Sequence, residues 1–255
     1  MHVELETSML WSFLAVLARV GSLFTFVPLP GLKSPFEPAR LLLSILLTLC
    51  LQPRWPLLQP SDTPLSSLLL LLARESILGL GTGLILLFLF EAFQFGAQAL
   101  SQLAGFSYAS TIDPTNDTDS GVLLILCQLF CGWLAIAFGL DRELVLLLAG
   151  SLETAPPGQV TVSLEGAGKI LRLGGVMFET GLRVALPAIG VFLMFDVLLG
   201  VLSRLEQQLQ LTTVLFPAKT AGTILVTASL VTVFPQTFQD LSQICLGVIR
   251  ALLRT

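Results

Sequence analysis

Three long stretches of this sequence contain no charged residue: Ala92–Ile112, Ser120–Leu140 and Thr220–Gln239. A helix needs about 20 predominantly apolar residues to cross the hydrocarbon core of a bilayer, so each stretch has roughly the length of one crossing. Charged residues make up only 12% of the 255 residues and hydrophobic residues 54%. A water-facing domain could not cover so much apolar surface. The composition therefore predicts an integral membrane protein in contact with membrane lipid.

The apolar segments indicate helices rather than strands. Ile85–Phe90 is a continuous apolar run, whereas the strands of a membrane barrel alternate apolar and polar residues. Clusters of Pro, Gly and polar residues divide the chain at Pro28–Pro38, Pro53–Pro64, Asp113–Gly121, Ala155–Gly168 and Arg204–Pro217. We expect an all-α fold of helical hairpins, with residues 1–255 forming a single membrane-embedded helical domain.

Six charged residues lie inside apolar segments that would otherwise resemble membrane crossings. They are Arg19, Arg74, Glu75, Glu179, Arg183 and Asp196. An ionised side chain at bilayer depth costs at least about 2.5–3.5 kcal/mol, so we expect these segments to pack against protein rather than lipid. Glu179 precedes Arg183 by four residues, the favourable order for an ion pair within one helix. Together with Asp196, the same residues would also suit an ion relay in a secondary transporter, and this alternative stays open.

Two glycines in an apolar segment, Gly79 and Gly83, are spaced four residues apart. Small residues at this spacing let a neighbouring helix backbone approach closely. A nucleotide-binding loop would need a preceding strand and a following Lys-Ser/Thr pair, which the sequence does not provide. We therefore expect Gly79 and Gly83 to mediate helix packing.

The sequence offers no pattern typical of a catalytic or metal site. His2 is the only histidine, which argues against a Ser-His or Cys-His pair. The four cysteines are interpreted as small buried apolar residues. A net charge of -4 gives no basic face for nucleic acid. We expect no enzymatic activity, no cofactor, no metal ion and no nucleic-acid partner.

The segment from Gly105 to Gly121 joins two of the uncharged stretches and includes the end of one and the start of the next. It begins with small, hydroxyl and aromatic residues and then turns at an Asp-Pro pair. One interpretation is a plain hairpin loop. The other is a re-entrant element, because non-helical backbone at membrane depth is tolerated where it lines a cavity. The residues that carry this interpretation are Gly105, Phe106, Ser107, Tyr108, Ala109, Ile112, Asp113 and Pro114.

The two ends of the chain differ in charge. Glu4 and Glu6 are acidic, and no basic residue lies among the first six, so we expect no cleavable signal segment. Arg250 and Arg254 form a basic flank near the carboxyl end. Because basic flanks favour the cytoplasmic side, we expect a periplasmic amino terminus and a cytoplasmic carboxyl terminus.

Motifs between about residue 19 and residue 235 resemble, in order, those of the FliR family. They are Arg19-Val20-Gly21 followed by Pro28, Pro38-Ala39-Arg40, Glu75 with Gly79 and Gly83, Gly105 to Ala109 through Asp113-Pro114, Arg183 to Pro187, Asp196 through Gly200 to Arg204, and Phe216 to Lys219. FliR proteins are the R component of the flagellar type III export gate. They are related to the T components of virulence-type secretion systems, and the motifs are compatible with both.

The resemblance implies a structural subunit of a pore-forming assembly in the bacterial inner membrane, at the flagellar basal body. The implied partners are the P and Q subunits, the A and B gate components beneath them, and unfolded exported proteins. The six charged residues would then help subunits to pack, and Gly105 to Gly121 would correspond to the family's plug loop. We further expect a polar turn facing the cytoplasm, near the gate components, which contains Arg204, Gln208, Phe216, Pro217 and Lys219.

Overall fold

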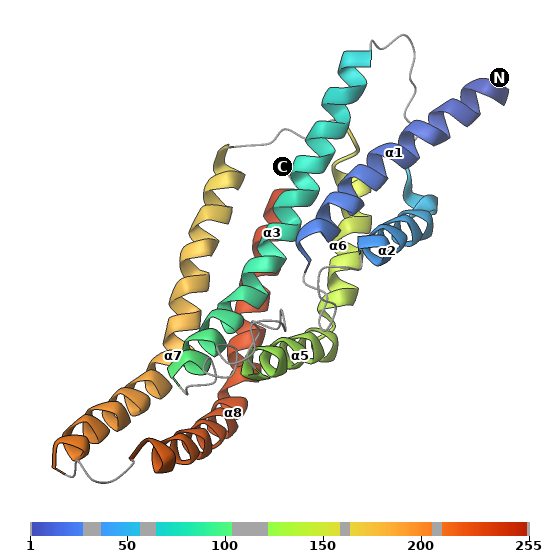
Figure 1. Ribbon diagram of the computed structural model, residues 1–255. Helices are drawn as coiled ribbons and strands as arrows, with labels where there is room; N and C mark the ends of the chain where they lie inside the picture. Colours follow the sequence, from blue (N-terminus) through green and yellow to red (C-terminus); the bar gives the residue numbers. More distant parts are fainter. Residues whose placement is uncertain are drawn as a thin grey trace. The chain divides into compact units, whose positions relative to one another are not determined.

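The computed structural model describes residues 2–27, 37–56, 65–103, 122–158, 164–205 and 211–253 (Figure 1). Its elements are α1 (His2–Phe26), α2 (Glu37–Cys50), the short 3-10 helix η1 (Gln52–Arg54), α3 (Leu65–Leu103), α5 (Val122–Ala137), α6 (Leu140–Thr154), α7 (Leu164–Leu205) and α8 (Leu211–Leu253). The expected all-α membrane fold is confirmed. The breaks after α1, α2, α6 and α7 fall at the clusters that the sequence predicts.

Three of the helices are much longer than a bilayer is thick. α3, α7 and α8 contain 39, 42 and 43 residues. At 1.5 Å per residue they are about 58–65 Å long, roughly twice the ~30 Å hydrocarbon core. Among the described residues, α1, α3 and α7 each contain a stretch long and apolar enough to cross a membrane, and up to five crossings result if each of two bent helix pairs is one span. The longest helices must therefore tilt, bend or extend beyond the hydrocarbon.

One break was not expected from the sequence. The uncharged stretch Ser120–Leu140 does not form one helix, because α5 ends at Ala137 and α6 begins at Leu140 with a bend of 61° between them. Gly139 lies at the bend with φ 68°, a left-handed conformation that glycine adopts without steric cost. The following acidic residues, Asp141 and Glu143, lie in the first turn of α6, where negative charge interacts favourably with the helix dipole.

The helices on either side of the predicted polar turn extend further into it than expected. Phe216, Pro217 and Lys219 lie within α8, and Arg204 still belongs to α7. Gln208 lies outside the described residues. Proline removes one backbone hydrogen bond, but helices in an apolar environment tolerate this loss when neighbouring groups satisfy the freed carbonyl. Our expectation that Pro217 marks a turn was therefore wrong.

The chain groups into two compact units. Unit 1 comprises Met1–Leu89, Ala135–Gly174 and Leu241–Thr255, and unit 2 comprises Phe90–Leu134 and Gly175–Asp240. α3, α5, α7 and α8 each contribute residues to both units. The expectation of a single membrane-embedded domain stays a prediction.

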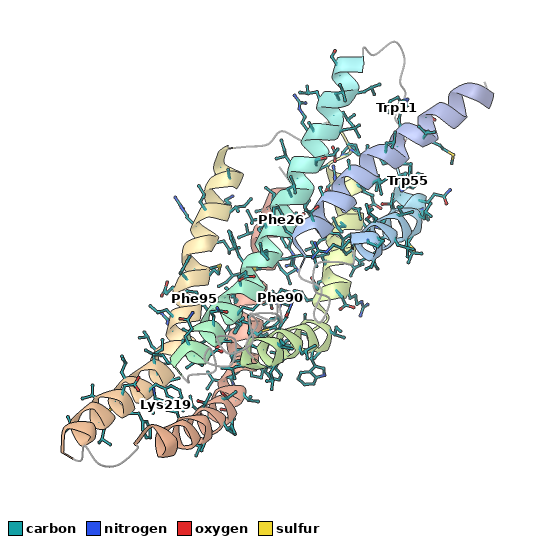
Figure 2. All side chains as sticks on the ribbon, viewed as in Figure 1. Trp11, Phe26, Trp55, Phe90, Phe95 and Lys219 are labelled. Atoms are coloured by element: carbon teal, nitrogen blue, oxygen red, sulfur yellow. The ribbon has the colours of Figure 1, made fainter. Side chains whose placement is uncertain are left out.

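In unit 1, α1 and α2 lie beside α6 (Figure 1). Val16, Val20 and Leu51 form a core cluster with Ala149 and Leu152 of α6. After η1, the ring of Trp55, which Figure 2 labels, lies 5.6 Å from the Phe13 ring, measured between centroids. The Trp55 indole N–H donates to the Thr48 carbonyl oxygen at 3.1 Å. These contacts hold the α1–α2 hairpin together.

Unit 2 has a separate apolar core. One cluster contains Leu100, Ala188 and Phe192. A second is aromatic: the Phe93 ring centroid lies 4.7 Å from that of Phe234 and 5.5 Å from that of Phe238. Cys127 and Cys131 of this unit are buried as expected, and so is Cys245 of unit 1, whereas Cys50 is exposed at the end of α2. The interpretation of all four cysteines as buried residues was therefore wrong for Cys50.

Candidate functional site

α1 and α3 approach each other closely in unit 1. A Cβ atom added at Gly79 would overlap the Ser22 hydroxyl and the Arg19 carbonyl oxygen, and one at Gly83 would lie 2.5 Å from the Leu23 carbonyl oxygen. Gly79 therefore contacts Arg19, and Gly83 contacts Leu23. Because both pairs are four residues apart and follow the same order along the chain, the two helices run parallel here. Residues spaced by four share one helix face, and Glu75 therefore faces α1 with Gly79 and Gly83.

Arg19 and Glu75 form an ion pair inside unit 1. The Arg19 Nε donates to Glu75 Oε2 at 2.6 Å, and the two side chains are 1% and 0% exposed. The other guanidinium nitrogens donate to Ser151 Oγ at 3.0 Å and to the Ala155 carbonyl oxygen at 3.1 Å. Glu75 Oε1 accepts the backbone N–H of Gly158 at 3.1 Å. Such a set of hydrogen bonds is what makes the burial of two charges tolerable.

This pairing differs from the contacts that the sequence led us to expect. We expected Arg19 and Glu75 to pack against partner subunits, but each satisfies the other within the chain. Two sequence features could have indicated this pair: the two residues have opposite charges in separate apolar segments, and Glu75 lies four residues before Gly79. Sequence reasoning missed Ser151 entirely, because a serine in a helix carries no sign of its distant partner. The adjacent Arg74 is exposed, as the ~100° rotation between helix neighbours dictates.

The charged residues of unit 2 lie in a different environment. Glu179 and Arg183 pair at 2.8 Å on α7, with the two side chains 67% and 77% exposed. Asp196 pairs with Lys219 of α8, whose position is labelled in Figure 2. The structure therefore places Asp196 in contact between α7 and α8, and Lys219 in a helix–helix contact rather than in a turn.

A small cavity lies within unit 2, beside a second close contact of backbones. A Cβ atom at Gly181 of α7 would overlap the Ala92 carbonyl oxygen of α3, and one at Gly96 would lie 3.2 Å from the Gly181 carbonyl oxygen. The cavity measures about 50 Å³, and its lining includes Phe93 and Thr227. Ligand pockets typically measure about 300–1,000 Å³, so this space is smaller than a typical ligand pocket.

The expected plug residues, Gly105 to Pro114, lie outside the described residues. In the part of the chain that is described, no group of three or more His, Cys, Asp or Glu side chains could hold a metal ion. The described residues offer a set of close helix contacts and charge pairs.

Comparison with known proteins agrees with the sequence motifs. The family described as bacterial export proteins, family 1, matches residues 10–244. The chain is 26% identical over 209 residues to the flagellar biosynthetic protein FliR of Escherichia coli (strain K12), covering 81% of this chain and 77% of that protein. It is 27% identical to FliR of Pectobacterium carotovorum subsp. carotovorum with the same coverage, and 27% identical over 179 residues to FliR of Borreliella burgdorferi, covering 68% and 65%. The resemblance to the FliR family is confirmed, and the chain belongs to the bacterial export proteins, family 1.

Proposed function

We propose that the chain is a structural subunit of the flagellar type III protein export gate in the bacterial inner membrane. In this role it helps to form and gate the pore through which unfolded flagellar proteins pass. The observation that carries the proposal is the family match from residue 10 to residue 244, together with relatives named as flagellar biosynthetic proteins. These names favour a flagellar role over a virulence-type one.

The exposed face of α7 supports an assembled state. Its apolar side chains Phe178, Leu182 and Leu186 are exposed, and so is the Glu179–Arg183 pair between them. A charged pair among apolar side chains is unfavourable against lipid, but a protein neighbour can offer both apolar and polar contacts. We assign this face to the P and Q subunits of the gate, with the A and B components on the cytoplasmic side.

The plug remains part of the proposal on sequence grounds. Phe106, Tyr108 and Ile112 supply bulky groups that could close a pore by excluding water. Gly105 permits backbone motion and Pro114 stops the helix. The proposed orientation places the amino terminus in the periplasm and the carboxyl terminus in the cytoplasm. A cysteine introduced at Gln208 should accordingly be modified from the cytoplasmic side and not from the periplasm of intact cells.

A secondary transporter would use buried charges along a path for its substrate. The two buried charged side chains among the described residues, Arg19 and Glu75, instead hydrogen bond each other and the end of α6. The cavity of unit 2 has a lining of apolar residues with one hydroxyl, that of Thr227. The described geometry therefore favours a gate subunit over a transporter.

Isolation of the intact assembly tests the proposal. A tagged chain, expressed from its own locus and extracted in mild detergent, should copurify with the P and Q subunits of the export gate. Recovery of the chain by itself as a monodisperse species that takes up a small substrate in vesicles would contradict the proposal and favour the transporter.

A permeability assay tests the plug. Phe106→Ala with Tyr108→Ala should leave the assembly intact but make cells leaky to small ions, because the bulk that excludes water is lost. Phe106→Leu with Tyr108→Phe is the matched control, since it keeps apolar bulk at both positions. If the alanine variant assembles and permeability stays at the control level, Gly105 to Gly121 is only a connecting loop.

A further inference from the structure

We propose that Arg19 and Glu75 act as a clamp that holds the chain where it leaves α6, at residues 155–158, which we call the α6 exit. The role goes beyond mutual neutralisation of two buried charges. It makes Arg19 and Glu75 positioning residues for the α6 exit.

The first contact of the clamp is with the carboxyl end of α6. The last carbonyl groups of a helix have no partner within the helix, and positive charge interacts favourably with this end. The Arg19 guanidinium supplies a hydrogen-bond donor and a positive charge at this end, since its Nη2 donates to the Ala155 carbonyl oxygen at 3.1 Å. Its Nη1 donates to Ser151 Oγ at 3.0 Å, while the same hydroxyl donates to the Leu148 carbonyl oxygen at 2.7 Å. Arg19 therefore caps α6 from a helix more than 130 residues earlier in the chain.

The second contact is with the turn after α6. The backbone N–H of Gly158 donates to Glu75 Oε1 at 3.1 Å. Gly158 has φ 92°, which strains any residue with a side chain. A Cβ atom there would also lie 3.3 Å from Leu71 Cδ1 of α3. Glu75 thus holds the turn against α3 at a point where only glycine fits without adjustment.

These contacts make the α6 exit depend on the contact between α1 and α3. Arg19 reaches Glu75 because Gly79 and Gly83 allow the α1 backbone to approach α3. Two leucines could fill the volume of the pair, but they could not bind a carbonyl oxygen at Ala155 and an N–H group at Gly158. The geometry therefore explains why charges rather than apolar groups occupy these positions.

The test compares two buried thiols of unit 1 in the full-length chain, in membranes of the bacterium that makes it. One, the exit reporter, is introduced by Ala155→Cys at the α6 exit, where the native residue is 8% exposed. The other is the native Cys245, which is 1% exposed and reports opening of the unit as a whole. Each thiol is the sole cysteine of its chain, and its reaction rate with a thiol reagent is measured.

Arg19→Leu with Glu75→Leu removes both charges and leaves neither unpaired. We expect the exit reporter to react about tenfold faster or more in this variant, because hydrogen bonds to charged groups are lost at the exit. Cys245 should keep its protection. The clamp is refuted if the exit reporter stays as protected as in the parent, and equally if both thiols gain reactivity together, since the pair would then stabilise the whole unit without a particular role at the exit.

Arg19→Lys provides a second variant that keeps the charge beside Glu75. An ammonium group is a point charge without the fork of a guanidinium, so it cannot reach Glu75, Ser151 and Ala155 at once. The exit reporter should react faster than in the parent while Cys245 stays protected. Full protection of the exit reporter in Arg19→Lys would show that charge alone suffices and would overturn the clamp.

Discussion

Units 1 and 2 hold their helices together by different means. In unit 1, a fully buried ion pair binds the end of α6, and its two side chains are at most 1% exposed. In unit 2, the cores are apolar and aromatic, and the charge pairs are at least partly exposed: Asp196–Lys219 joins α7 and α8, and Glu179–Arg183 lies on the surface of α7. Both units use glycine where backbones approach, at Gly79 in one and Gly181 in the other. Within one chain, charged residues of apolar helices can therefore form a buried pair inside the core, as in unit 1, or an exposed pair on the surface, as in unit 2.

The physical costs of perturbing the two units should differ accordingly. Removing one member of a buried ion pair costs about 3–5 kcal/mol, because the other charge is left buried without a partner. An exposed pair contributes only about 0–1 kcal/mol. Unit 1 should therefore be sensitive to the loss of a single charge, and unit 2 to the loss of packed volume.

Arg19→Leu should have the largest effect. It leaves the Glu75 carboxylate buried in unit 1, so we expect a loss of about 3–5 kcal/mol of stability and a sharp fall in the amount of folded chain in membranes. The measurement is the steady-state level together with the reactivity of Cys245. Arg19→Leu with Glu75→Leu should recover much of the level. If the double variant is no better than Arg19→Leu, an uncompensated charge is not the cause.

Phe93→Ala should have the next largest effect, within unit 2. It removes a ring that packs against Phe234 and Phe238, and the cavity that remains costs about 3 kcal/mol. The native Cys131, buried in the same unit, should become reactive before Cys245 does. Phe93→Leu, which keeps most of the volume, is the control. Equal reactivity of Cys131 and Cys245 would show that the two units do not respond separately.

Gly79→Ala should have an intermediate effect. The added methyl group would overlap Arg19 and Ser22, and such overpacking typically costs about 1–3 kcal/mol. Gly150→Ala in α6 is the matched control, because nothing lies within 4 Å of the added Cβ. That control should be neutral or more stable by up to about 1 kcal/mol, as alanine favours the helix. Thermal stability in detergent compares the two variants, and an equal loss in both would contradict the close contact of α1 and α3.

Glu179→Gln should have the smallest effect on the chain itself. Because the Glu179–Arg183 pair is exposed, its loss should change stability by no more than about 1 kcal/mol. Any larger effect should appear only as weaker recovery of the P and Q subunits with the tagged chain. If Glu179→Gln lowered the level of the chain as much as Arg19→Leu does, the two units would not differ in their sensitivity to the loss of a charge.

The sequence predicted the type of fold better than its details. Long uncharged stretches and Pro-rich breaks are local signals, so the helices and most of their separations could be predicted. The bend at Gly139 was missed, because one glycine in an apolar stretch is compatible with a straight helix. At Pro217 the expectation failed in the opposite way, because a turn was expected and α8 continues through this residue.

The charges show where sequence reasoning stops. That Arg19 and Glu75 need partners follows from their apolar surroundings. Which partners they have depends on how residues far apart in the chain come together. The contacts with Ser151, Ala155 and Gly158 could not be predicted from any local sequence pattern. Two of these three contacts involve backbone atoms, which no residue type marks.

Protein export from cells that lack this chain tests the functional account most directly. We predict that deletion of its gene abolishes the appearance of flagellar proteins outside the cell, and that the wild-type gene on a plasmid restores it. The Phe106→Ala, Tyr108→Ala variant should restore export while leaving cells permeable to ions. Export at the wild-type level in the deletion strain, with its other export genes intact, would contradict the assignment of this chain to the gate.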